Sequence, residues 1–145
     1  MKYTIEIELN LPRKRVIELF DNPENMKHWQ EGFISFTPLD GVPGEVGSTA
    51  ELKYKTGKRA FELVETIIVN NFPDEFSASY KTTGMTNYIY NYFIEVDKNT
   101  TKWISENKCN ARGIVKLMTL IMPGTFKKYS MKFLKDFKNF AESKN

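Results

Sequence analysis

The sequence predicts an α+β fold in which a curved antiparallel sheet of about seven strands is wrapped around a long C-terminal helix. Apolar residues recur at helical spacing through residues 125–143. Six stretches with strand-like alternation follow one another between residues 31 and 109, separated by short turns. Strands joined in this way pair antiparallel, and an antiparallel sheet with segregated helices is an α+β arrangement. We expect residues 1–145 to form a single domain.

The apolar stripe of the C-terminal helix predicts that the rest of the chain forms a broad apolar surface against it. Its apolar positions form one stripe: Phe126, Tyr129, Ser130, Phe133, Leu134, Phe137, Phe140 and Ala141. A helix over residues 125–143 would be roughly 28 Å long, and a stripe with four phenylalanines needs a broad apolar partner. A sheet that twists and curls around the helix supplies that partner and leaves room for a cavity between them.

The N-terminal region predicts one strand and two short helices. Alternation over Lys2–Asn10 is typical of a half-buried strand. Pro12 suits the first turn of a helix that carries Phe20 on its apolar face. Pro23 ends that helix and opens a second one, which finishes at Trp29.

The remaining strands are expected at 31–37, 49–55, 59–70, 75–82, 85–96 and 101–109. The glycine-rich segment 41–47 is interpreted as a turn, because it leads into a strand and lacks the lysine of a phosphate-binding loop. Strand 85–96 leaves two alternatives for its inner face, either Tyr88, Tyr90, Tyr92 and Ile94 or Asn87, Ile89, Asn91 and Phe93. We favour the second set, because stacked tyrosines tolerate water on an outer face.

Residues 111–122 allow two interpretations. The segment is apolar and is bounded by Gly113 and by Pro123-Gly124, as a hinged gate over a cavity would be. It also fits the first, buried part of the long helix, kinked at Pro123.

Composition and charge narrow the class of protein. The single cysteine, Cys109, excludes an internal disulfide. The chain starts without a basic-then-apolar leader and has no apolar run of membrane-spanning length, so we expect a cytoplasmic protein. Residues 1–110 carry 13 Lys or Arg and 16 Asp or Glu (net −3), whereas residues 111–145 carry 8 and 2 (net +6). We interpret the basic excess as the solvated face of the C-terminal helix.

Catalytic candidates are few. His28 is the only histidine, so neither a Ser-His-Asp triad nor a histidine metal site is expected, and no cofactor is predicted. We expect His28 to be a surface or packing residue. Glu65 and Glu106 could each point into a cavity and act as acid or base, but an exposed position on the outer face is the more common arrangement for such carboxylates.

Three stretches of the chain carry a family resemblance. They are Leu11-Pro12 through Phe20 to Trp29, the turn Gly41–Gly47, and Phe61–Glu65 with Phe72-Pro73. In this order they resemble the helix-grip superfamily (START, pollen-allergen-like, SRPBCC), and most nearly its bacterial polyketide cyclase/dehydrase-like branch. Members of the superfamily bind lipids, sterols, quinones or plant hormones, and a minority catalyse cyclisation, aromatisation or dehydration. The resemblance implies a fold and a cavity but no particular reaction.

We therefore expect the protein to bind, and by doing so to transport or sequester, a small hydrophobic ligand between sheet and helix. The expected ligand-binding residues are Tyr54, Asn87, Ile89, Asn91, Trp103, Ser105, Met118, Phe126, Tyr129, Phe133 and Phe137. One alternative is a polyketide cyclase, aromatase or dehydratase without metal. Another is a lipid or quinone chaperone, or an interaction module, that makes transient membrane contact through the basic helix face. Nucleic-acid binding is not expected, and both a monomer and a homodimer are compatible with the sequence.

Overall fold

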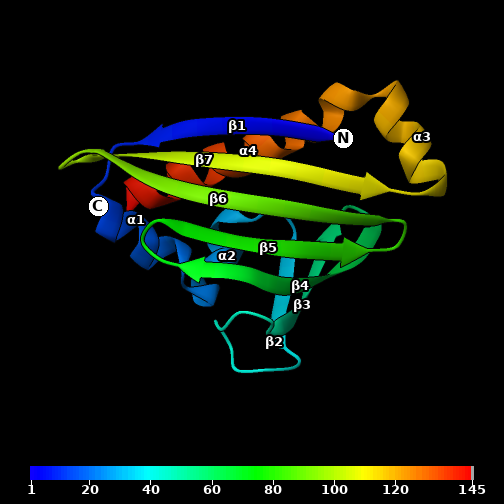
Figure 1. The fold of residues 1–145 in the computed structure, drawn as a ribbon, viewed down its shortest axis with the longest axis horizontal. Coiled ribbons are helices and arrows are strands. Elements are labelled where there is room, and N and C mark those ends of the chain that lie inside the picture. The colour runs from blue at the N-terminus through cyan, green and yellow to red at the C-terminus, as the bar shows by residue number, and fades with distance from the viewer. Residues whose placement is uncertain (145) are drawn as a thin grey trace.

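The computed structural model describes residues 1–144, and in it seven strands form one antiparallel sheet in the order β1-β7-β6-β5-β4-β3-β2 (Figure 1). The strands are β1 (Lys2–Leu9), β2 (Phe33–Pro38), β3 (Thr49–Thr56), β4 (Arg59–Asn71), β5 (Glu75–Thr82), β6 (Met85–Asp97) and β7 (Thr100–Ala111). Each strand from β2 onward pairs with the next one in the chain, and β1 closes the order by pairing with β7. The predicted α+β sheet is confirmed, and its strand ends differ from the prediction by two residues or fewer.

Five helical segments accompany this sheet within residues 1–144. They are α1 (Arg13–Phe20), the short 3-10 helix η1 (Pro23–Asn25), α2 (Met26–Trp29), α3 (Gly113–Ile121) and α4 (Pro123–Ser143). Helix α4 runs behind the sheet in Figure 1, whereas α3 stands beyond the end of β7. The interpretation of 111–122 as a buried first part of the long helix is wrong, because α3 is a separate helix without a buried residue. Pro123 sits at the start of α4, where its missing N–H costs nothing.

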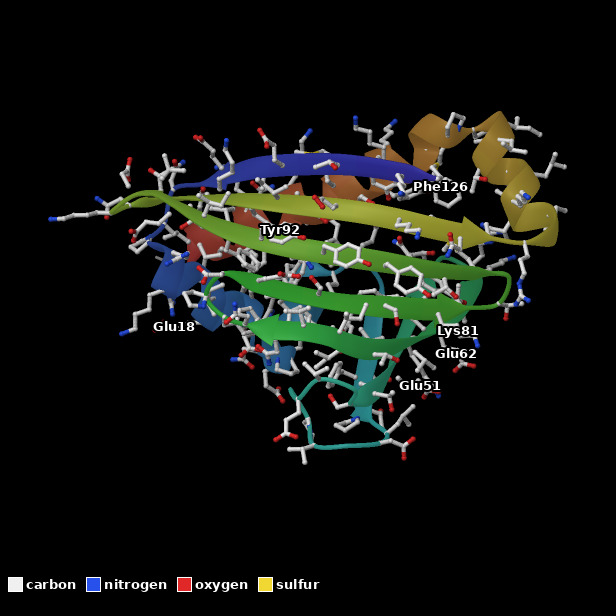
Figure 2. All side chains as sticks on the ribbon, viewed as in Figure 1. Glu18, Glu51, Glu62, Lys81, Tyr92 and Phe126 are labelled. Carbon is white, nitrogen blue, oxygen red and sulfur yellow. The ribbon has the colours of Figure 1, made fainter. Side chains whose placement is uncertain are left out.

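The inner face of β6 is the one we favoured. Asn91 and Phe93 are buried and stand opposite Ser105 and Trp103 of β7, which face α4. Tyr92 lies on the opposite face of the sheet, and Figure 2 shows it on the side turned away from α4. The amide-bearing face of β6 therefore points toward the helices.

The core is densest at the end of the sheet covered by α1 and α2, which we call the packed end. Phe20 lies at the centre, with ring centroids 5.1 Å from Phe93, 5.4 Å from Trp103 and 5.9 Å from Phe137. The Trp103 Nε1–H donates a 2.8 Å hydrogen bond to Asn91 Oδ1, whereas the buried Trp29 Nε1 of this cluster has no hydrogen-bond partner within residues 1–144. Edge-to-face aromatic pairs of this kind add stabilisation beyond their buried area.

Candidate functional site

A row of polar side chains crosses the inner face of the sheet. In the strand register Glu65 of β4 stands opposite Tyr80 of β5, Tyr80 opposite Asn87 of β6, and Asn87 opposite Cys109 of β7. Directly paired residues in adjacent strands present their side chains on the same face. We call these four residues the polar row.

Glu65 is half-buried on the inner face of the sheet, contrary to our expectation that its side chain would be exposed on the outer face. Its strand register explains the difference, because Glu65 pairs with the buried Ala50 and shares its face with the buried Ile67. The Tyr80 hydroxyl donates to Glu65 Oε2 over 2.8 Å. Burial raises the pKa of the Glu65 carboxyl, and the hydrogen bond from Tyr80 lowers it only in part.

Tyr54 of β3 extends the polar surface toward α2. Its hydroxyl donates to Gln30 Oε1 over 2.6 Å, and its ring stacks on Phe61 at 5.2 Å. Burial and the nearby Glu65 charge raise the Tyr54 pKa far above that of a free tyrosine. Tyr54 therefore stays protonated at any physiological pH and acts as a fixed donor.

Two amide oxygens on this inner face have no hydrogen-bond partner within residues 1–144. Asn87 Oδ1 and Asn107 Oδ1 are buried and accept no hydrogen bond. The Asn107 amide is oriented from its other end, since Nδ2 donates to Ser105 Oγ over 3.1 Å. Buried amide oxygens are nearly always paired, and leaving one unpaired costs roughly 1–3 kcal/mol. A bound molecule with an N–H or O–H group would pair them.

Aromatic side chains near the start of α4 and on the facing part of β4 are partly exposed. Tyr129 is 68% exposed, Phe133 is 37% exposed, and Phe61 on β4 is 44% exposed. Phe137, on the same stripe of α4, is fully enclosed. We call the region of Phe61, Phe126, Tyr129 and Phe133 the open end, in contrast to the packed end.

Two surface hollows accompany this arrangement. One, of about 690 Å³, lies between α2 and the C-terminal part of α4 and is lined by His28, Gln30, Asp136 and Asn139, among others. The second, of about 540 Å³, lies beside α1, Phe72 and Pro73. Neither lies beneath the first half of α4, so a ligand cavity there stays a prediction.

The expected site residues fall into separate groups. Tyr54, Asn87, Ile89 and Ser105 lie on the inner face of the sheet, and Phe126, Tyr129 and Phe133 belong to the open end. Asn91, Trp103 and Phe137 are enclosed within the packed end and serve as core. Met118 is exposed on α3.

Two of the catalytic candidates, Glu106 and His28, are exposed on the surface. Glu106 is exposed, because the side chains flanking it in β7, Ser105 and Asn107, occupy the inner face. His28 is exposed and stacks on Phe140 at 5.8 Å, as expected for a packing histidine. Within residues 1–144 no three His, Cys, Asp or Glu side chains gather as a metal site would require.

Sequence reasoning missed Tyr80 and Asn107 as site residues. Both could have been found, because Tyr80 alternates with Phe76 and Ala78, and Asn107 alternates with Ser105 and Trp103. What the alternation alone does not give is the pairing of Tyr80 with Glu65, which depends on the register across two strands.

Solved structures with the same fold are numerous, although no protein-family model and no curated protein matches the sequence. A conserved protein from Geobacillus kaustophilus superposes with a TM-score of 0.79 at 12% identity, over 99% of this chain and 96% of that one. The Zhui aromatase/cyclase from Streptomyces sp. R1128 gives 0.76 at 10% identity, over 98% and 93%. Norcoclaurine synthase from Thalictrum flavum, in complex with dopamine and hydroxybenzaldehyde, gives 0.72 at 11% identity, over 100% and 88%. At this identity the likeness concerns the fold, and it confirms that the chain has the helix-grip fold.

Proposed function

We propose that the protein binds a small, largely hydrophobic ligand that carries at least one hydrogen-bond donor, between the inner face of the sheet and the first half of α4. The apolar part of the ligand would cover Phe61, Phe126, Tyr129 and Phe133. Its polar part would reach the polar row. Packing of this kind, with mostly apolar walls and a few oriented polar groups, is typical of small-molecule sites.

The unpaired oxygens of Asn87 and Asn107 are the observation that carries this proposal. They are acceptors, and the nearby Tyr54 and Tyr80 hydroxyls are already engaged as donors. This inner face therefore fits a ligand that donates a hydrogen bond, such as an alcohol, a phenol or an amine. An apolar molecule without a donor would leave both oxygens unpaired.

Two of the similar structures agree with a ligand of this chemistry. Norcoclaurine synthase was solved with dopamine and hydroxybenzaldehyde, which are small aromatic molecules with hydroxyl groups. The Streptomyces protein is described as an aromatase/cyclase. Both share the fold of this chain, which supports a small aromatic or polyketide-like ligand here.

The test uses N-phenylnaphthylamine, an uncharged apolar dye with one N–H donor, titrated by fluorescence. We expect saturable binding, which Tyr129→Ser weakens roughly tenfold through the loss of apolar contact area. The matched control is Tyr92→Ser, a tyrosine on the outer face of the sheet, and it should bind like the unmodified protein. A second control, Ile121→Ser on α3, tests whether the dye adheres to that exposed helix instead. Non-saturable binding, or equal loss in all three variants, would rule the proposal out.

One observation favours an enzyme as the second candidate. The Glu65 carboxyl faces inward, its pKa is raised by burial, and Tyr80 orients it. Such a group can take a proton from a carbon next to a ketone, leaving the electron pair in the enolate. Exchange of that hydrogen for deuterium in an aryl methyl ketone, followed by NMR, should be faster with the protein and lost in Glu65→Gln. Equal exchange with and without the protein would leave ligand binding as the function.

A further inference from the structure

Helix α3 exposes an apolar surface that nothing in the described chain covers. Of its nine residues, Ile114 is 76%, Leu120 72% and Ile121 68% exposed. Leu117, Met118 and the following Met122 are also exposed. Contiguous apolar surface of this kind on a soluble domain marks an interaction site.

The orientation of α3 is held by the end of the sheet. Its preceding residue, Arg112, donates its backbone N–H to the Gly84 carbonyl over 2.8 Å. Val115 packs so closely on the β5–β6 turn that a Cβ at Gly84 would lie 3.3 Å from Val115 Cγ2. With Val115 turned toward the sheet, the remaining apolar side chains are held outward.

Basic residues lie near this apolar surface along the chain and at the same end of the sheet. Arg112 directly precedes α3 and Lys116 lies within it. Lys127 and Lys128 lie in the second turn of α4. The β3–β4 turn, with Lys58 and Arg59, is at the same end of the sheet, since β4 starts where β5 ends. Figure 2 shows Phe126, Lys81 and Glu62 toward this end of the molecule. Between Glu106 and Asp136 the chain has no acidic residue, whereas it has seven Lys or Arg.

An anionic membrane is the partner that satisfies both features. Apolar side chains can enter the boundary between headgroups and acyl chains, while the nearby Lys and Arg contact anionic headgroups. A second copy of this chain fits less well, because a two-fold contact through α3 would bring the basic residues of both copies together. Nucleic acid would pair with the lysines but would leave Ile114, Leu120 and Ile121 in water.

We propose that α3 is a membrane-docking helix that lies on anionic phospholipid surfaces, with Ile114, Leu117, Leu120 and Ile121 in the interface and Arg112, Lys116, Lys127 and Lys128 on the headgroups. Within residues 1–144 no helix is long and apolar enough to cross a bilayer, so this contact is peripheral. The docking surface is separate from the proposed ligand site and does not depend on it. It places the open end, at the start of α4, next to the bilayer.

The experiment is flotation of the full chain with vesicles of pure phosphatidylcholine and with vesicles containing about one-third phosphatidylserine. We expect binding to the anionic vesicles at low salt, at least tenfold weaker binding to pure phosphatidylcholine, and weakening by added salt. Ile114→Ser/Leu120→Ser/Ile121→Ser should lower binding to the anionic vesicles at least tenfold. Arg112→Gln/Lys116→Gln should also lower it about tenfold and reduce the salt dependence.

The matched control is Ile94→Ser/Val96→Ser, which removes two exposed apolar side chains from β6 at the opposite end of the sheet. It should bind vesicles like the unmodified protein. All these side chains are exposed, so circular dichroism and thermal melting should be unchanged in every variant. Equal binding to both vesicle types, no binding to either, or equal loss in the control would overturn the proposal. So would a dimer in sedimentation that the α3 variant dissociates, because α3 would then be covered by a second copy.

Discussion

The packed end and the open end of α4 carry similar side chains but are covered very differently. Phe137 lies within reach of Phe20, Trp29, Trp103 and Phe140 and is fully enclosed. Two turns earlier, Tyr129 is largely exposed. The difference comes from the elements opposite: α1 and α2 enclose Phe137, whereas at the open end α2 reaches only Phe133, through Trp29 at a centroid distance of 4.5 Å. An apolar stripe on a helix therefore does not by itself say which of its residues are core and which are available to a ligand.

Replacing Phe137 should show the largest effect, because it removes the centre of the packed end. We expect Phe137→Ala to lower the free energy of unfolding by about 3–5 kcal/mol, since the fully enclosed ring leaves a cavity behind. Urea denaturation followed by tryptophan fluorescence measures it. The matched change at the open end, Tyr129→Ala, should cost less than about 0.5 kcal/mol. Similar losses at both positions would mean that the two ends are equally packed.

Trp103→Phe tests the polar bond inside the packed end. Phenylalanine keeps most of the ring volume but leaves Asn91 Oδ1 buried without its 2.8 Å partner. We expect a loss of about 2 kcal/mol in unfolding free energy, from the unpaired acceptor and the smaller ring. The double change Trp103→Phe/Asn91→Leu should recover part of that loss. A double variant less stable than the sum of the single ones would contradict this explanation.

The pH dependence of stability tests the placement of Glu65. Its folded pKa is raised by burial, so the folded state holds the proton more tightly than the unfolded state. This carboxyl should therefore lower stability as pH rises from the ordinary glutamate pKa through the raised one. Glu65→Gln should be more stable than the unmodified protein at neutral pH, and the two should converge in acid. Thermal melting across pH 4–8 measures it, and parallel curves would show that Glu65 is not buried in solution.

Asn87→Leu should have the smallest effect on stability. The change removes an amide oxygen that has no hydrogen-bond partner, so unfolding free energy should stay the same or rise by up to about 1 kcal/mol. Dye binding should weaken, because the donor of the dye loses its acceptor. The control is Asn99→Leu in the exposed β6–β7 turn, which should leave dye binding unchanged. A clear loss of stability in Asn87→Leu would show that its amide is paired in solution.

Periodicity was enough to predict the antiparallel sheet, the succession of strands joined by hairpins, and the long helix. Alternation places every second side chain on one face, and the helical stripe of α4 follows from spacing alone. It also indicated the inner face of β6, since Asn91 and Phe93 are buried. These features are local, and they do not depend on which segments meet.

Residue spacing alone did not predict which side chains are covered by other segments of the chain. Glu65 lies in a stretch of β4 that is apolar on both faces, so only its pairing with Ala50 and Tyr80 decides that it points inward. Whether 111–122 is core or surface also depends on what the sheet end offers as a partner. At that end Val115 packs against Gly84, and the other side chains of α3 stay exposed or half-buried.

The most direct test of ligand binding at the open end is native mass spectrometry of the protein as purified, before and after extraction with organic solvent. We expect a non-covalent adduct of one small, mostly apolar molecule with a hydroxyl or amine group. The adduct should disappear on extraction and be depleted in Tyr129→Ser/Asn87→Leu, while the outer-face variant Tyr92→Ser keeps it. An adduct retained equally in both variants, or a protein that carries no adduct and does not bind N-phenylnaphthylamine, would contradict the account.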